Sequence, residues 1–323
     1  MASDTLTSNL MAPATASFAP TAMALSPSRL RDLSARSDAQ GLSRAASHYA
    51  AVLLMAGVIG WVLARWGLLA AAPLVIVQGY LVAFLFSPMH ESAHKTAFRS
   101  RRLNIAVGQL SGLLIIHPYE YYALYHWDHH RYTQDPDRDP ELLNASLPMS
   151  DTALAIAFSG CLSVLRRIRL LLRHALTGRV TAPWVPQKKR RLVITEARAY
   201  LLFYGLALAG SIGLGTGILV WTWLVPLFLG QLFLRPYLLA EHTGCTHTRN
   251  AYENTRTTYT NAVVRWFSWN MPYHAEHHAY PSIPFHALPR LNVVVGNRIM
   301  HRGRGYVRVV RECWGWMRRA RPQ

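Results

Sequence analysis

Four long apolar stretches restrict this chain to a helical fold that crosses a membrane. Residues 50–64 and 68–89 form one pair, and residues 197–212 and 218–240 form a second. Each stretch approaches the ~20 residues that an α-helix needs to span the hydrocarbon core of a bilayer. The turn inside each pair is too short to hold a domain. We therefore expect an all-α integral membrane protein with four transmembrane helices arranged as two hairpins.

The composition agrees with a membrane protein that has an excess of positive charge. Only 15% of the 323 residues are charged, and the mean hydropathy is +0.10. A typical soluble domain has about 25% charged residues. The formal net charge is +18, for which nucleic-acid binding is the usual explanation. Because that explanation accounts for neither the apolar stretches nor the histidines described below, no nucleic-acid partner is expected.

The distribution of this charge predicts the orientation in the membrane. Arginines and lysines follow the first apolar pair, precede the second pair and close the chain, whereas the two hairpin turns together hold only Arg65. By the positive-inside rule, the basic segments and both termini then lie in the cytoplasm. Attraction to anionic lipid headgroups is a second reason for a basic face.

Three segments are expected along the chain. Residues 1–44 are rich in Ala, Ser, Thr and Pro, a composition that buries too little surface to offset the entropy of ordering, and predict a disordered leader. Residues 45–301 are expected to form the membrane domain, and residues 302–323 a basic C-terminal tail. The shorter apolar segments 103–116 and 147–165 predict interfacial or partly inserted helices.

Eight histidines form three short clusters with the spacing of metal ligands on helices. The clusters read His90-Glu91-Ser92-Ala93-His94, His126-Trp127-Asp128-His129-His130 and His274-Ala275-Glu276-His277-His278. Residues i, i+3 and i+4 share one face of an α-helix, so each cluster can aim two or three imidazoles at one point. Zinc sites usually take four ligands, and eight imidazoles therefore favour two metal ions. On the predicted topology all three clusters lie in a cap on the cytoplasmic side.

The residues alone leave the metal open. Imidazoles with nearby carboxylates suit iron, copper or zinc, and the scattered cysteines Cys161, Cys245 and Cys313 argue against an iron–sulfur centre. Zinc offers Lewis-acid and hydrolytic chemistry, so a zinc-dependent membrane hydrolase is one alternative. A metal transporter is another, but it would place its ligands near the bilayer midplane, whereas these clusters lie beyond the apolar stretches.

The order of the three clusters around two apolar hairpins resembles the membrane fatty-acid desaturase and hydroxylase superfamily. The acyl-lipid and sphingolipid desaturase branches are the most similar. The flanking residues carry part of this resemblance: Asp135-Pro136 and Asp139-Pro140 follow the second cluster, and Asn270-Met271-Pro272-Tyr273 precedes the third. The resemblance covers roughly residues 45–300.

The resemblance implies a diiron centre held by the eight histidines and one further ligand between the last span and the third cluster. His242 is our choice for that ligand, and His247 is the alternative. The implied ligands are His90, His94, His126, His129, His130, His242, His274, His277 and His278. The implied enzyme uses O2 and two electrons to introduce a C=C bond into an acyl group on lipid, CoA or a carrier protein. Hydroxylation, or desaturation of a specialised small metabolite, is the alternative within the same chemistry.

Four acidic residues are candidates to accept the second ring N–H of the ligand imidazoles, which fixes their tautomer and aim. They are Glu91, Asp128, Glu241 and Glu276. The His-Pro-Gly-Gly haem motif of a fused cytochrome b5 domain is missing, since the only His-Pro is His117-Pro118. A separate electron donor is therefore expected, such as ferredoxin or cytochrome b5, and the basic face would help to steer an acidic donor.

Overall fold

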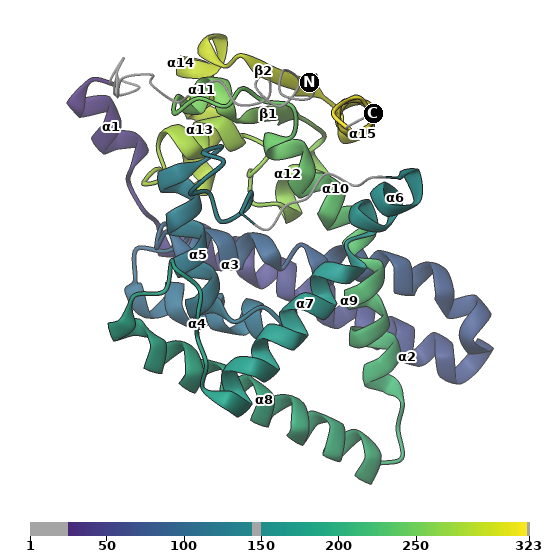
Figure 1. Cartoon of the computed structure of the whole chain (residues 1–323). Helices are drawn as coiled ribbons and strands as arrows, with labels where there is room; N and C mark the ends of the chain where they lie inside the picture. The colour runs from purple at the N-terminus through teal and green to yellow at the C-terminus, as the bar shows by residue number, and fades with distance from the viewer. Residues whose placement is uncertain (1–24, 144–149, 322–323) are drawn as a thin grey trace, which may run out of the picture.

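The chain is predominantly helical, as predicted. The computed structural model describes residues 25–143 and 150–321. Within them the only strands are β1 (Arg256–Tyr259) and β2 (His301–Arg304), which pair in parallel. Figure 1 shows long helices in the lower half of the view and short C-terminal elements gathered above them.

The first apolar pair forms α2 (Asp38–Ala83), which folds back on itself at Gly67 (Figure 1). Gly67 has φ 77°, in the left-handed region that glycine adopts without steric penalty. The side-chain Nε2 of Gln78 donates a hydrogen bond of 3.2 Å to the carbonyl oxygen of Val52. In a straight helix those residues would be about 39 Å apart. The two halves of α2 therefore run side by side.

The second apolar pair forms α8 (Arg190–Gly213) and three shorter helices that follow one another in the chain. These are η3 (Val220–Leu224), α9 (Val225–Leu229) and α10 (Gln231–His242). Figure 1 shows that α8 and η3 are joined at the end of the molecule farthest from the C-terminal elements.

Three helical stretches of the described chain are long and apolar enough to cross a membrane. They are Pro27–Ala93, Gln187–Gly213 and Val220–His242. Large apolar side chains project from them, including Leu69, which is 91% exposed, and Ile212, which is 71% exposed. Apolar exposure of this extent is typical of a surface that lipid or a partner covers.

The helices of the first and second apolar pairs meet closely at two glycines, Gly79 and Gly230. A Cβ atom on Gly230, between α9 and α10, would collide with the carbonyl oxygen of Gly79 on α2 and would lie 2.7 Å from the Cβ of Ala83. This contact sets the start of α10 close to the end of α2. Helix α3 (Phe86–Ala93) follows directly after α2.

The predicted interfacial segments are helical. Residues 103–114 of the first segment fall in α4 (Arg101–Leu114). Residues 151–159 and 161–165 of the other segment fall in α6 (Asp151–Ser159) and α7 (Cys161–Leu172). Gly160, with φ 68°, breaks α6 from α7. Residues 144–149 lie outside the described part of the chain, and the interfacial placement of these helices stays a prediction.

The predicted disordered leader extends too far. Residues 1–24 lie outside the described residues, but α1 (Pro27–Leu33) and the first turns of α2 occupy most of residues 25–44. Ser26 and Ser37 cap these two helices, each accepting a backbone N–H three residues later. Serine at an N-cap satisfies donors that a helix start leaves unpaired. The amino-acid composition alone does not reveal these helix-capping serines.

The segment predicted as a basic tail is a folded part of the molecule. Residues after β2 form α15 (Tyr306–Arg319), which buries Val309 and Cys313 against Leu154 of α6 and Ala240 of α10. Its arginines lie on the opposite, exposed face, as expected of an amphipathic helix. The apolar stripe of α15 therefore anchors the C-terminal elements to α10.

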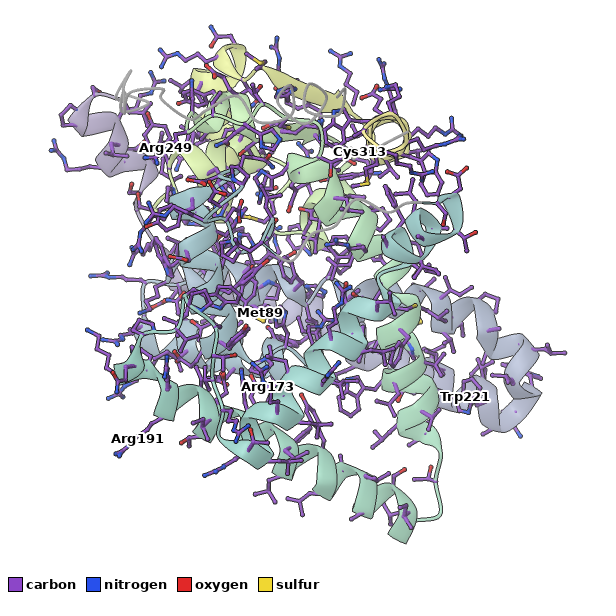
Figure 2. The ribbon with its side chains drawn as sticks, in the orientation of Figure 1. Met89, Arg173, Arg191, Trp221, Arg249 and Cys313 are labelled. Carbon is purple, nitrogen blue, oxygen red and sulfur yellow. The ribbon has the colours of Figure 1, made fainter. Side chains whose placement is uncertain are left out.

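The remaining elements are shorter, and α11, α13 and α14 among them lie at the top of the view in Figure 1. They are α5 (Tyr119–Tyr132), η1 (Arg173–Thr177), η2 (Gln187–Lys189), α11 (Ala251–Asn254), α12 (Ala262–Phe267), α13 (His274–Ala279), η4 (Phe285–Ala287), α14 (Leu288–Val295) and η5 (Gly296–Arg298). The main core runs beneath them and includes Phe84, Met89, Trp269 and Phe285. Met89, labelled near the centre of Figure 2, precedes the first histidine of the first cluster.

The glycine contact gives a stability prediction. Gly230→Ala should lower the free energy of unfolding by about 1–3 kcal/mol, because the added methyl group overpacks the α2 contact. Gly205→Ala on α8 is the matched control, since its Cβ would meet nothing within 4 Å. The midpoint of thermal unfolding in detergent measures both. Equal midpoints for the two variants would contradict this packing.

Candidate metal centre

Nine histidines from four helices converge in the interior. Helix α3 supplies the first cluster, α5 the second and α13 the third, and α10 ends at the ninth histidine. On α5 the i, i+3, i+4 spacing turns three imidazoles to one side. All nine are largely shielded from solvent, apart from His130 and His278, which are half-buried.

Five of these histidines form the first group. In this five-histidine group each residue offers one ring nitrogen within 4.8 Å of the others: His90, His94, His126, His130 and His277. The Nε2 atoms of His94 and His126 are 2.8 Å apart, and those of His126 and His130 are 3.0 Å apart. The Nε2 atoms of His90 and His277 are 2.9 Å apart.

The other four form the second group. The ring nitrogens of His129, His242 and His278 lie within 4.8 Å of one another. The Nε2 atom of His274 lies 3.1 Å from that of His278. The structure thus brings His242 into this four-histidine group. It leaves out the alternative, His247, which is exposed and has its Nδ1 3.2 Å from the carbonyl oxygen of Gln134.

The spacing of these nitrogens fits a metal ion better than hydrogen bonds between imidazoles. A neutral imidazole has one N–H, yet the Nε2 of His126 approaches two other Nε2 atoms. Nitrogens about 2.1 Å from an ion are about 3.0 Å apart at right angles and about 3.4 Å apart in a tetrahedron. The observed separations of 2.8–3.1 Å match the right-angle arrangement.

The electrostatic environment keeps most of the imidazoles neutral. Burial, followed by the charge of His129, lowers the pKa of His277 to about 3. Burial also holds the pKa of His126 well below its ordinary value, with neighbouring histidines adding to the effect. The neutral imidazole is the form that binds metal. These side chains are therefore ready to act as ligands at neutral pH.

His129 differs because two carboxylates lie beside it. Its Nδ1 is 2.9 Å from Oδ1 of Asp139, and its Nε2 is 4.0 Å from Oε1 of Glu141. Burial lowers the pKa of His129, but Glu141 and Asp139 outweigh it and raise the pKa to about 9. The Asp139 carboxylate also accepts the backbone N–H groups of Gln134 and Glu141, at 2.8 and 2.9 Å. It is therefore fixed in place to orient the imidazole.

Asp139 is a site residue that the sequence interpretation missed. It lies in the Asp139-Pro140 sequence, and its backbone N–H donates to the carbonyl oxygen of Asp135, which turns the chain back toward α5. The turn-forming residues between the two aspartates were the available signal. These residues predict that the chain reverses its direction directly after α5. Such a reversal can bring a carboxylate back beside the helix that carries the histidines.

Of the four predicted acidic partners, only Glu241 lies beside an imidazole. Its Oε1 is 3.4 Å from Nδ1 of His274. The other three have different partners in the described residues. Glu91 accepts the backbone N–H of Phe285, Asp128 pairs with Arg131, and Glu276 accepts bonds from Thr257 and Asn292.

The helix geometry explains this outcome. Glu91, Asp128 and Glu276 are each next in sequence to a histidine of their own helix. Neighbouring helical residues point about 100° apart, so these carboxylates face away from the imidazoles. Glu241 also adjoins a histidine but reaches one on α13 instead.

Neutral groups orient three more imidazoles. The Tyr122 hydroxyl is 3.1 Å from Nδ1 of His90, and Oγ1 of Thr133 is 3.2 Å from Nδ1 of His278. Nδ1 of His242 is 3.2 Å from the carbonyl oxygen of Asn254. Such partners fix which ring nitrogen faces inward. They carry no sequence signal, because tyrosine, threonine and backbone carbonyls occur throughout the chain.

Comparison with known proteins agrees with this arrangement. The sequence profile of the family described as Fatty acid desaturase matches residues 64–309, which include all nine histidines. The chain belongs to the fatty acid desaturase family. The resemblance inferred from the histidine clusters is thereby confirmed, and the alternatives of a zinc hydrolase or a transporter lose their support.

Three relatives of this desaturase-family protein show the range of names among similar chains. It is 27% identical over 273 residues to dihydrorhizobitoxine desaturase of Bradyrhizobium elkanii, covering 80% of this chain and 74% of the relative. It is 27% identical to sn-1 oleoyl-lipid 12-desaturase of Picosynechococcus sp. over 59% of this chain and 57% of the relative. It is 24% identical to a fatty acid desaturase of Bacillus subtilis over 68% and 66% of the two chains.

These findings support a desaturase-type oxidoreductase with a metal-binding histidine cluster. The three candidate spans and the family together indicate a membrane protein. At these identities the relatives differ from one another in substrate name, so the substrate of this chain is treated as a proposal below.

The contact between Asp139 and His129 gives a second prediction. Asp139→Asn should reduce metal affinity about 10- to 100-fold, because an amide cannot act as the charged acceptor for the imidazole N–H. Asp128→Asn, on the outer face of α5, should bind metal like the wild type. Iron content after dialysis against graded chelator measures both variants. Similar retention in both would show that Asp139 does not orient a ligand.

Proposed function

We propose that this protein is a membrane diiron desaturase that introduces a C=C bond into a largely saturated chain. The observation that carries the proposal is the pair of adjacent histidine groups, five imidazoles in one and four in the other. In the overall reaction, O2 takes up two electrons and two protons from the donor side and two hydrogens from the substrate. The products are the alkene and two waters.

Iron is the metal that suits both groups and this reaction. The five-histidine group and the four-histidine group would each hold one ion, through nitrogens that face inward. Iron in such sites supplies the redox chemistry that allows dioxygen to cleave an unactivated C–H bond. Zinc is less suitable, because five imidazoles exceed its usual four ligands and the right-angle spacing differs from its tetrahedral preference.

The residues of the chain itself bind, orient and shield. Four imidazoles each contact a partner through Nδ1, so that the Nε2 atoms of these imidazoles face the metal positions. The partners are Asp139, Glu241, Tyr122 and Thr133. Burial of the histidines excludes bulk water from the reacting carbons. Exclusion of water strengthens electrostatic interactions and limits side reactions.

The arrangement supports four membrane spans, made by the two halves of α2, by α8 and by η3 to α10. The turns at Gly67 and at 214–219 would then lie on the outer side. The basic segments, the histidine groups and both termini would lie on the cytoplasmic side by the positive-inside rule. Arg191, which Figure 2 shows at the outer edge near the start of α8, would mark the cytoplasmic end of that helix.

The leading substrate is a fatty acyl group, attached to lipid, CoA or a carrier protein. A specialised small metabolite is the second candidate, favoured by the match over 80% of this chain to a relative named for dihydrorhizobitoxine. Electrons would come from a separate acidic protein such as ferredoxin or cytochrome b5. Exposed arginines of α15 border a surface hollow of about 630 Å³ that suits an acidic partner.

Product analysis in a host with known lipids tests this proposal. The wild type should yield a product that has lost two hydrogens, detected by mass spectrometry, whereas gain of one oxygen would mean hydroxylation. His242→Ala should abolish the product, because it removes a nitrogen from the four-histidine group. His247→Ala, five residues away, should retain full activity. Activity in His242→Ala equal to that of His247→Ala would contradict the proposed ligand set.

A further inference from the structure

One arginine of α7, Arg167, points toward the interior of the molecule. Val164 and Leu171 of α7 are 0% and 2% exposed, and Arg167 lies between them on the same helical face. Arg166 and Arg169, by contrast, are exposed. Basic side chains on an amphipathic helix normally occupy its outer face. Arg167 therefore departs from the pattern that governs the rest of α7.

The inward donors of Arg167 lack a partner in the described residues. Its Nε and Nη2 atoms are shielded from solvent and form no hydrogen bond there. A guanidinium has five N–H donors and no acceptor. Burial lowers its pKa only to about 10, so it stays charged at neutral pH. Buried charges in proteins are normally paired, and an anionic acceptor would pair with these donors.

A second unpaired group lies near Arg167. His117, between α4 and α5, has a buried Nδ1 without a partner among the described residues. Burial, and then the charge of Arg167, holds the pKa of His117 well below its ordinary value. Neutral His117 can therefore donate one N–H. The hydroxyl of the neighbouring Tyr204 is already engaged, since it donates to the carbonyl oxygen of Leu113 at 2.7 Å.

A single aromatic ring separates His117 from the five-histidine group. The ring of His117 meets the ring of Tyr122 edge-on, with centroids 4.9 Å apart. The Tyr122 ring stacks on His126 at 5.2 Å, and its hydroxyl bonds His90. A small molecule held by Arg167 and His117 would thus have its next carbons beside the metal ligands.

We propose that Arg167 and His117 form a subsite for the carboxylate of the substrate. A guanidinium presents two parallel N–H groups that match the two oxygens of a carboxylate. The substrate class is then a free carboxylic acid with a short saturated chain. This favours the second candidate, a small metabolite, over the esterified acyl group, because an ester carries no charge at this position. This inference names the substrate class of the desaturase site, and it rests on the proposed function.

Binding of short fatty acids to the full-length, iron-loaded protein in detergent tests the subsite. The probes are hexanoate, octanoate and decanoate, each compared with its methyl ester by calorimetry. The wild type should bind the acids more tightly than the esters. Arg167→Met should weaken acid binding on the order of 10- to 100-fold, the loss expected for hydrogen bonds to a charged group. Ester binding should not change.

Two variants keep the result interpretable. Arg166→Met, the exposed neighbour on α7, should bind the acids like the wild type. Arg167→Lys retains the charge without the two-pronged geometry and should give an intermediate affinity, and it substitutes for Arg167→Met if that variant fails to fold. Iron content and unfolding temperature identify folded protein.

Three outcomes would overturn the subsite. One is equal binding of acids and esters by the wild type. Another is equal acid affinity in Arg167→Met and Arg166→Met. The third is that Arg167→Met loses affinity for phosphatidylglycerol vesicles while acid binding stays intact, which would assign Arg167 to lipid phosphate.

The subsite and the desaturase function fail in different ways. Unsaturated acyl lipid formed equally by wild type and Arg167→Met would refute the subsite and keep the function. Carboxylate binding that depends on Arg167, without any product that has lost hydrogens, would refute the function and keep the subsite.

Discussion

The convergence of nine imidazoles in a buried volume is the constraint on which the rest of the structure depends. Two neutral imidazoles can share only one proton, and the Nε2 atom of His126 lies within 3.0 Å of two others. Such nitrogens repel one another unless a cation lies between them. The fold therefore has to hold the four ligand-bearing segments rigidly, and a bound metal would in turn join α3, α5, α10 and α13.

Much of the helical layer can be understood as the support for this convergence. The fold-back at Gly67 and the glycine contact hold the end of α2, which leads into α3, beside the start of α10. The C-terminal elements then close the site, because α15 packs its apolar face on α10. Removing solvent keeps most of the imidazoles neutral, and Asp139 and Glu241 set the aim of two of them.

Features set by local spacing could be predicted from the sequence, whereas features set by chain reversal could not. The histidine clusters and the apolar stretches depend on positions within one helix, whereas His242 was inferred from the family resemblance. Asp139 reaches His129 only through the turn after α5, and Glu241 reaches His274 across two elements. Proximity in sequence predicted imidazole contacts for Glu91, Asp128 and Glu276. Adjacent residues on a helix, however, point in different directions. The predictions for the leader (residues 1–44) and the tail (residues 302–323) rested on composition. Composition does not reveal the serine helix caps or the apolar stripe of α15.

The central claim is that the two histidine groups hold two separate irons. Anomalous diffraction from crystals of the full-length protein, collected on both sides of the iron absorption edge, tests it most directly. We expect two iron peaks, one bounded by the five-histidine group and one by the four-histidine group. A single peak, or peaks that appear only at the zinc edge in protein that retains activity, would contradict it.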